Sequence, residues 1–187
     1  MAMQIHPLGN FGGMVKNYEK GRRNYPGQVF KFLKSLIKVK KPLILDVGCG
    51  TGIATRQLAK FGTVIGADPD PIMLSAARKH RTPAVKKYVV AKADKLPFKS
   101  NTFDVVTAFS AFHWFADKKS VSEIKRVLKP HGIFFVAGKS GIKSWGQGYR
   151  RAIIKSIRRQ TAQFVTAKGF DSKRIMMKQG GFRNVRH

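Results

Sequence analysis

The feature that most constrains the fold is residues 43–52, which read Leu-Ile-Leu-Asp-Val-Gly-Cys-Gly-Thr-Gly. Apart from one aspartate, the first half is apolar, as is typical of a strand buried on both faces of a parallel sheet. The alternate glycines let the chain turn sharply and bring bare backbone against a ligand. A helix expected over 52–60 would point its unpaired N–H groups at the same place. The run predicts a strand, loop and helix around a ligand site.

The spacing of the glycines restricts the class of ligand that the loop could bind. A dinucleotide site uses Gly-x-Gly-x-x-Gly to seat a pyrophosphate. Here the pattern is Gly-x-Gly-x-Gly, and Asp46 stands two residues before the first glycine. A carboxylate there would repel a phosphate but would suit the amino end of a zwitterionic ligand.

Strand-like and helix-like segments alternate along the chain. We expect strands at 43–47, 63–67, 85–91, 103–109 and 132–138, and helices at 28–40, 52–60, 71–79 and 117–128. Such alternation favours right-handed βαβ crossovers and a doubly wound α/β fold around a mostly parallel sheet. Ligands of such sheets bind beyond the carboxyl ends of the strands. The glycine run, Asp68 and Asp94 all fall at those ends.

Four segments, in order, resemble one enzyme family. Asp-Val-Gly-Cys-Gly-Thr-Gly at 46–52 resembles motif I of the class I S-adenosylmethionine-dependent methyltransferases. Residues 66–74 resemble the end of the second strand of that family, and residues 95–98 and 101–106 resemble its third-strand loop and fourth strand. Residues 123–132 resemble the helix and turn that lead into its fifth strand. The resemblance implies a Rossmann-like methyltransferase sheet. It also implies that S-adenosylmethionine is the cofactor and S-adenosylhomocysteine the product.

The resemblance assigns most of the cofactor site. In it, Asp46 holds the amino group of the cofactor, and the loop at 48–50 contacts its methionine part. Asp68 would accept hydrogen bonds from both ribose hydroxyls, a role compatible with capping the next helix. The cofactor-binding residues implied in these strands and loops are Asp46, Gly48, Cys49, Gly50, Asp68, Pro69, Met73, Ala93 and Asp94. Pro69 and Met73 would pack on the adenine, or serve the core instead.

The chain departs from the family at the adenine edge. The commonest pattern there is Gly-Asp-Ala-Glu, whereas residues 91–94 read Ala-Lys-Ala-Asp. Lys92 cannot accept a bond from the adenine amino group, so Asp94 is the candidate for that role. A branch resembling trans-aconitate methyltransferase, methyltransferase type 11, also lacks that aspartate. Its Ala-x-His-Trp-Phe run resembles residues 110–115, Ser-Ala-Phe-His-Trp-Phe.

This branch implies three further assignments. The acceptor would be a small molecule, Tyr25 would close over the cofactor, and Ser110 would belong to the cofactor site. His113 is the candidate catalytic residue, as a general base near a substrate hydroxyl or carboxyl. Transfer from a sulfonium needs little base help, so a structural His113 under the lid is the alternative. His113 and Trp114 together could also stack a planar substrate.

The charge favours a different partner. The chain has 37 Lys and Arg against nine acids, a formal net charge of +28. Such a basic protein attracts polyanions, and nucleic acid bound through Arg151, Lys155, Arg158 and Arg159 is the corresponding candidate. These residues share one side of a helix expected over 145–168, whose alternative role is a solvated face. An RNA- or ribosome-directed methyltransferase is therefore the rival function.

The length suits one methyltransferase domain over residues 1–187. We divide it into an N-terminal lid and helix at 1–41, a cofactor-binding core at 42–138, and basic C-terminal helices with a partial last strand at 139–187. Residues 181–185 resemble the first of the family's two closing antiparallel strands, which leaves the C-terminal strands incomplete. That keeps a non-catalytic binding module as a second alternative, and an open sheet edge could pair with another chain to form an oligomer.

The remaining composition bears on the compartment. The single cysteine, Cys49, excludes an internal disulfide and a cysteine-rich metal site, so no metal is expected. No run approaches the roughly 20 apolar residues of a membrane span. Residues 1–13 lack the charged and apolar segments of a secretory signal. These observations predict a cytoplasmic protein.

Overall fold

The computed structural model describes residues 24–137 and the backbone of residues 163–166. The strands are β1 (Leu43–Val47), β2 (Thr63–Asp68), β3 (Val85–Val90), β4 (Phe103–Phe109), β5 (Leu128–Ala137) and β6 (Gln163–Thr166). The helices are α2 (Gly27–Leu36), α3 (Ile53–Leu58), α4 (Pro71–Lys79), the short 3₁₀ helix η2 (Phe112–Trp114) and α5 (Lys118–Val127).

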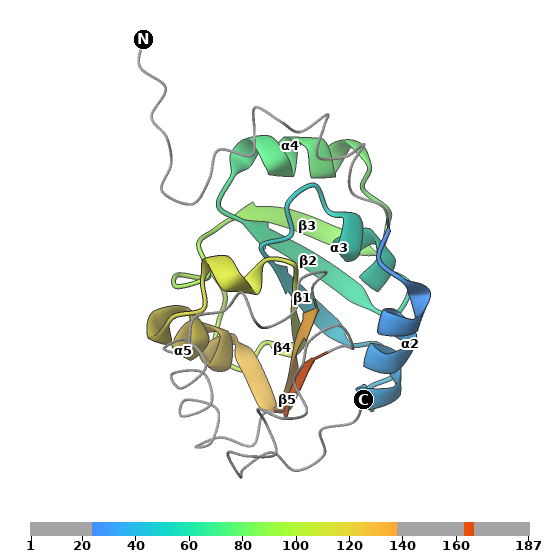
Figure 1. Ribbon diagram of the computed structural model, residues 1–187, viewed down its shortest axis with the longest axis vertical. Coiled ribbons are helices and arrows are strands. Elements are labelled where there is room, and N and C mark those ends of the chain that lie inside the picture. Colours follow the sequence, from blue (N-terminus) through green and yellow to red (C-terminus); the bar gives the residue numbers. More distant parts are fainter. Residues whose placement is uncertain (1–23, 138–162, 167–187) are drawn as a thin grey trace.

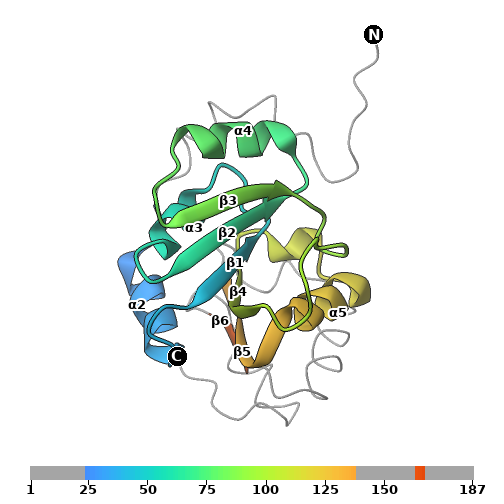
Figure 2. The ribbon, with the colours of Figure 1, turned by 180° about the vertical axis from the view of Figure 1, so that it is seen from behind.

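The strands form one sheet in the order β3-β2-β1-β4-β5-β6, and every pairing in it is parallel. Figures 1 and 2 show the sheet from opposite sides, with β3 below α4 and β5 beside α5. The order reverses between β1 and β4, which start the two halves of the sheet. In sheets of this kind, ligands bind beyond the carboxyl ends of the strands at this reversal. The prediction of a doubly wound parallel α/β sheet is confirmed.

Two apolar layers hold the sheet between helices. On one face, Phe30 and Leu33 of α2 and Leu58 of α3 pack over the central strands, with Phe109 and Phe135 among the strand residues that they meet. On the other face, α5 contributes Val121, Ile124 and Val127. Alternate residues of each central strand therefore serve opposite cores, which explains why β1 and β4 read as almost continuous apolar runs.

Two helices begin at aspartates that cap them. Asp70 accepts hydrogen bonds from the N–H groups of Ile72 and Met73, at 2.8 and 3.3 Å, and Pro71 occupies the first turn of α4. Asp117 likewise accepts a bond of 2.8 Å from the N–H of Ser120 at the start of α5. Such caps satisfy N–H groups that have no partner within the helix.

An ion pair on α5 joins that helix to the loop after β3. Glu123 and Arg126 on α5 form a two-pronged pair with N–O distances of 2.8 Å. Glu123 also accepts from the N–H of Leu96, while Arg126 donates to the carbonyl oxygens of Leu96 and Phe98. The pair therefore clamps the loop after β3 to α5. Its role in this structure is to hold that loop.

The structure corrects two expected elements. The segment Lys-Pro-His-Gly at 129–132 is part of β5, not a turn between a helix and a strand, because α5 ends at Val127 and β5 begins at once. A step from Phe103 to Val105 on β4 matches a step from Leu128 to Ile133 on β5, so the extra residues bulge out, with His131 at φ 61°. The helix expected over 145–168 is wrong at its end, since residues 163–166 form β6.

Other expectations fall outside the described residues. These include the closing strand expected near 181–185, the rest of the helix expected over 145–168, and the four basic residues Arg151, Lys155, Arg158 and Arg159. Within residues 24–137, the helix expected over 28–40 ends at Leu36, because Ile37 is already extended.

Candidate functional site

The glycine run forms a tight loop after β1. The N–H groups of Gly48 and Cys49 both donate to the carbonyl oxygen of Ala67 at the end of β2, at 2.8 and 3.1 Å. Gly48 and Gly52 have φ values of 69° and 76°, in the left-handed region that side chains disfavour. A Cβ at Gly48 would lie 2.5 Å from the Cβ of Ala111, and one at Gly52 would run into the Tyr88 hydroxyl. Both positions therefore require glycine on two grounds.

Asp46 lies at the reversal of strand order, with only 1% of its surface exposed. The Thr55 hydroxyl on α3 donates to its Oδ2 at 2.7 Å, and the Thr107 hydroxyl on β4 donates to its Oδ1 at 2.8 Å. Burial raises the pKa of Asp46 to about 6, although both hydroxyl bonds oppose that change. Each carboxylate oxygen keeps capacity for a further bond, so a cationic ligand could still pair with it.

Asp68 ends β2 beside the same loop. Its Oδ2 accepts a bond of 2.8 Å from the N–H of Gly50, and its Oδ1 accepts one of 2.9 Å from the N–H of Asp70. Burial raises its pKa, and the two backbone bonds act in the opposite direction. Asp68 therefore fixes the loop as well as the turn into α4, while Asp70 is the residue that caps α4.

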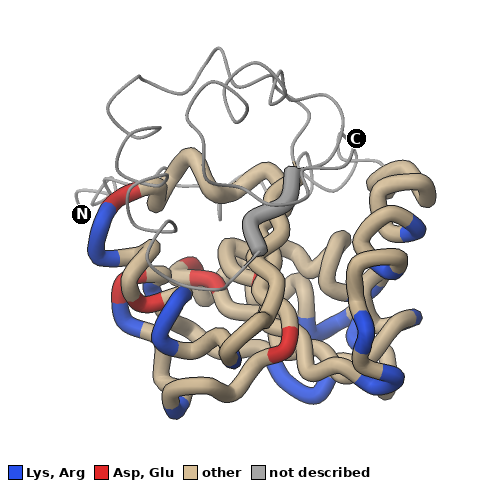
Figure 3. Tube along the Cα trace, turned by 90° about the horizontal axis from the view of Figure 1, so that it is seen from below, with Lys and Arg blue, Asp and Glu red and all other residues tan. Residues whose placement is uncertain are grey.

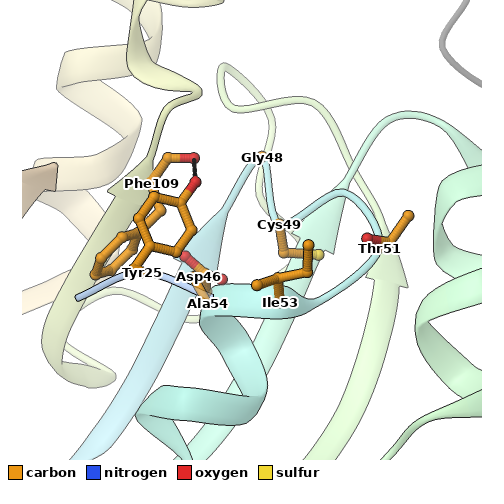
Figure 4. A pocket seen from close by; sticks show the side chains of 8 residues that line it. All are labelled: Tyr25, Asp46, Gly48, Cys49, Thr51, Ile53, Ala54 and Phe109. Carbon is orange, nitrogen blue, oxygen red and sulfur yellow. Dashed lines mark hydrogen bonds between the residues drawn. The ribbon is translucent and has the colours of Figure 1, made fainter. Parts of the chain in front are cut away.

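A small hollow opens beside the glycine loop (Figure 4). Its lining comes from the lead-in, β1, the loop, α3 and β4, and consists of Tyr25, Asp46, Gly48, Cys49, Thr51, Ile53, Ala54 and Phe109. The Tyr25 hydroxyl donates to the carbonyl oxygen of Phe109 at 3.3 Å, and the two rings meet edge to face at 4.9 Å. The tyrosine thus stands over the carboxyl ends of β1 and β4.

The lead-in segment is tied to α3 through Gln57. The N–H of Tyr25 donates to Gln57 Oε1, and Gln57 Nε2 donates to the carbonyl oxygen of Tyr25, both at 3.0 Å. The Gln57 side-chain amide thus satisfies both backbone groups of Tyr25, as a neighbouring strand would do. It holds the Tyr25 ring at the edge of the hollow.

The segment after β3 presents the least constrained acid. Asp94 is exposed, and it has no hydrogen bond or ion pair to any residue that the structure describes. The six other acids within residues 24–137 all accept such bonds. A bridge between Lys92 and Lys95 closes the turn that carries Asp94, with Ala93 buried beneath it.

Three other expected residues, Met73, Pro69 and Cys49, are buried or half-buried. Met73 is buried inside α4, with 4% exposed, and Pro69 is half-buried beside it. Cys49 packs towards Gly66 and the core under α4. Desolvation, followed by the charges of Asp68 and Asp46, raises the pKa of its thiol, so the sulfur stays protonated.

Ser110 directly follows β4 with φ 51°, and its N–H donates to the carbonyl oxygen of Ala137 at 2.6 Å. Its hydroxyl is buried and has no partner among the described residues, an arrangement that costs stability unless a ligand or water completes it. Two residues later, η2 exposes His113 and Trp114, whose rings lie 4.9 Å apart.

Sequence patterns alone miss the partners of Asp46. Thr107 lies opposite Asp46 in the register of β1 and β4, and Thr55 faces it from the first turn of α3. A hint of Thr107 is visible, because it is the one hydroxyl residue within an otherwise apolar stretch at 105–109. No comparable hint reveals Gln57 or the lining by Phe109.

These features define a class. A glycine loop lies at the reversal of a parallel sheet, with one acid near the end of β1 and another at the end of β2. This arrangement is typical of α/β domains that bind nucleoside-containing ligands. The comparisons with known proteins name it: residues 45–136 match the family model described as a methyltransferase domain. This part of the chain is a class I S-adenosylmethionine-dependent methyltransferase domain.

Two relatives are similar in sequence to part of this chain. An uncharacterised methyltransferase of Mycobacterium tuberculosis is 33% identical over 124 residues, which make up 66% of this chain and 49% of that protein. The mitochondrial arginine-hydroxylase of Homo sapiens is 37% identical over 99 residues, or 51% of this chain and 28% of that one. This chain therefore spans about half the length, or less, of these relatives.

A solved structure extends the likeness to the fold. The protein solved in complex with the Haloferax volcanii Trm112 methyltransferase activator superimposes with a TM-score of 0.61 at 25% identity, covering 78% of this chain and 72% of that one. Within the described residues, no group of three or more potential metal ligands comes together. No helix among those residues combines the length and apolarity needed to cross a bilayer.

Proposed function

We propose that this chain binds S-adenosylmethionine at the carboxyl ends of β1, β2 and β3 and transfers its methyl group to a small-molecule acceptor. The observation that carries the proposal is the joint position of Asp46, Asp68 and the glycine loop at the reversal of the sheet. In this proposal Asp46 would hold the amino end of the ligand. Asp68 would accept hydrogen bonds from its ribose.

The residues present fit the proposed cofactor. Asp46 retains acceptor capacity for an ammonium group, and Asp68 retains one free position on each oxygen for the ribose hydroxyls. The buried Ser110 hydroxyl lacks a partner that a ligand could supply, and Asp94 is open to the adenine edge. Tyr25 would cover the ligand from the side of α3.

The chemistry that the cofactor supplies is an already activated methyl group on a sulfonium. The protein then has mainly to orient the acceptor and exclude water, because proximity provides much of the rate. His113 lies on η2, just beyond β4, where it would receive the proton of an acceptor hydroxyl or carboxyl, or else support the lid. Its exposed neighbour Trp114 offers a flat apolar surface to the acceptor.

Binding is tested by calorimetric titration with S-adenosylmethionine. Asp94→Ala is the sharpest variant, because Asp94 has no described partner and its loss should leave the fold intact. We expect one saturable site in the wild type, weakened in this variant, and unchanged in the matched variant Lys95→Gln. A folded wild type that binds no cofactor would instead support the non-catalytic module.

Transfer is tested separately, with labelled cofactor and a cell extract as the acceptor source, which is separated into small molecules and RNA after the reaction. Mass analysis of the product distinguishes an added methyl from an added oxygen, the change that the name of the human relative describes for that protein. Label found in RNA rather than in small molecules would favour the rival substrate class. In that case Arg151, Lys155, Arg158 and Arg159, all outside the described residues, would be the first positions to change.

A further inference from the structure

A group of lysines lies at the amino ends of the strands, which form the amino edge of the sheet. The proposed cofactor site lies at the carboxyl ends. Five exposed side chains, here called the amino-edge lysines, come from the end of α2, the connection into β1 and the connection into β2: Lys34, Lys38, Lys40, Lys41 and Lys60. They precede the amino ends of β1 and β2. The acids of the proposed cofactor site, Asp46 and Asp68, lie near the carboxyl ends of the same two strands.

Contacts show that these segments meet. The N–H of Thr63 donates to the carbonyl oxygen of Pro42 at 3.0 Å, and a side chain at Gly62 would run into Pro42. The ammonium of Lys34 lies 5.9 Å from the centroid of the Phe61 ring. Lysines separated by some 20 positions in sequence therefore share one surface, on the side of the molecule where α2 lies (Figure 3, right).

No acid neutralises this surface from within. Residues 24–42 and 53–63 contain no Asp or Glu. The carboxylate that reaches the start of β1 is Asp104, and it is already bound to the N–H of Leu43 and, at 2.8 Å, to the ammonium of Lys129. None of the five lysines has an ion pair with a described residue. An external anion that lies against these lysines would relieve their mutual repulsion.

The side chains on this surface indicate which class of anion it would bind. Its only exposed large apolar side chain is Val39, so within the described residues it lacks the aromatic anchors of a protein interface and the stacking platform of a single-strand binder. Lysines without base-reading or stacking partners suit phosphates. We propose that the amino-edge lysines bind the phosphate backbone of a double-stranded nucleic acid, without sequence preference.

This inference does not depend on the proposed methyl transfer. A duplex on the amino edge would leave the carboxyl edge open, so it would hold the protein in place and would not itself reach the methyl group. We therefore expect the affinity for S-adenosylmethionine to stay the same when duplex is saturating. That readout separates failure of this inference from failure of the proposed function.

The test measures binding of the full chain to a labelled DNA duplex of about 20 base pairs over a range of salt concentrations. The surface variant changes Lys38, Lys40, Lys41 and Lys60 to glutamine. The matched control changes four exposed lysines elsewhere, Lys79, Lys86, Lys118 and Lys119, and so removes the same charge. A third variant places arginine at the four surface positions, keeping the charge.

We expect the surface variant to bind at least about tenfold more weakly at low salt, with a log–log salt slope reduced by about 0.9 for each phosphate that is no longer neutralised. The control and the arginine variant should stay close to the wild type. Equal weakening in the surface variant and the control would show an effect of net charge alone and overturn the proposal. Tighter binding to a single strand, or to vesicles of anionic phospholipid, than to the duplex would also overturn it.

Discussion

The Thr107 hydroxyl donates to Asp46 Oδ1 at 2.8 Å, across the one strand pair where the order of the sheet reverses. The bond joins the first strands of the two halves of the fold at the residue that faces the proposed ligand. With Thr55 on the other oxygen, it holds a buried carboxylate that has no cationic partner among the described residues. The buried carboxylate of Asp46 therefore suits the binding of a cationic ligand and does not stabilise the fold.

The first prediction concerns stability against pH. Asp46 has a pKa of about 6 in the folded protein against 3.8 for an ordinary aspartate, so the folded state holds its proton more tightly. Ionised Asp46 therefore lowers the free energy of unfolding above pH 6, by up to about 3 kcal/mol, and this penalty disappears as the pH falls from 6 towards 3.8. Urea unfolding of Asp46→Asn should lack this component. Identical pH profiles of wild type and variant would contradict the assignment.

The second prediction concerns ligand affinity against pH. The ammonium of S-adenosylmethionine would pair with ionised Asp46, so the proton must leave before binding. Affinity should be constant between about pH 6 and pH 7.5, where Asp46 is ionised and the ligand's amino group is still protonated, and should fall below pH 6, approaching tenfold for each pH unit. Titration calorimetry of the wild type at several pH values measures this, and Asp46→Asn should bind weakly without that dependence. A wild-type affinity that rises towards acid pH would place the amino group elsewhere.

A third prediction separates stability from binding at Ser110. Its buried hydroxyl has no described partner, so Ser110→Ala removes a group that the fold alone does not satisfy. We expect unfolding free energy to stay the same or rise by about 1 kcal/mol. Affinity for S-adenosylmethionine should nevertheless fall, because the ligand would lose a hydrogen bond. Lower stability with unchanged affinity would make Ser110 a structural residue.

The fourth prediction concerns the clamp of α5 on the loop that carries Asp94. Arg126→Ala removes the donors to Leu96 and Phe98 and leaves Glu123 without its partner. We expect a loss of about 2 kcal/mol in unfolding free energy. Arg126→Lys keeps the charge but not the planar fork, so its stability should lie between the two. Chemical unfolding of the wild type and the two variants gives the order of their stabilities. If Arg126→Lys were as stable as the wild type, the positive charge alone, and not the planar fork, would account for the clamp.

The parts of the fold that could be predicted are those where local pattern and tertiary role agree. The expected bounds of β1 and β4 coincide with those observed, because both strands are buried on two faces and read as apolar runs. The start of β5 was not predictable in this way. Lys-Pro-His-Gly has the composition of a turn, and only the pairing with β4 makes it a bulge within a strand.

The site divides along the same line. The glycine loop, Asp46 and Asp68 are visible in the sequence, since the loop and Asp46 lie within one strand, loop and helix and Asp68 ends the next strand. The threonines that hold Asp46 become visible only once β1, β4 and α3 are assembled. Gln57 is a similar case, because its partner is the backbone of Tyr25, and backbone groups leave no trace in sequence.

The last prediction tests the packing behind the loop. Tyr88 on β3 directs its hydroxyl against Gly52, where it is buried and has no described hydrogen-bond partner, and burial raises its pKa to about 12. Gly52→Ala would add both a collision with that hydroxyl and left-handed strain of about 1 kcal/mol. Tyr88→Phe removes only an unpaired hydroxyl, so its own effect on unfolding free energy should be small.

The double variant should therefore lose less stability than the two single variants together, because phenylalanine makes room for the new methyl group. A coupling of about 1 kcal/mol or more in a double-mutant cycle would show that contact between the hydroxyl and the loop, not only the backbone angle, makes glycine necessary at this position. The control is Gly48→Ala with Tyr88→Phe, since Gly48 meets Ala111 and not Tyr88. Those two changes should be additive. If both cycles gave the same coupling, the effect would belong to the loop as a whole and not to this contact.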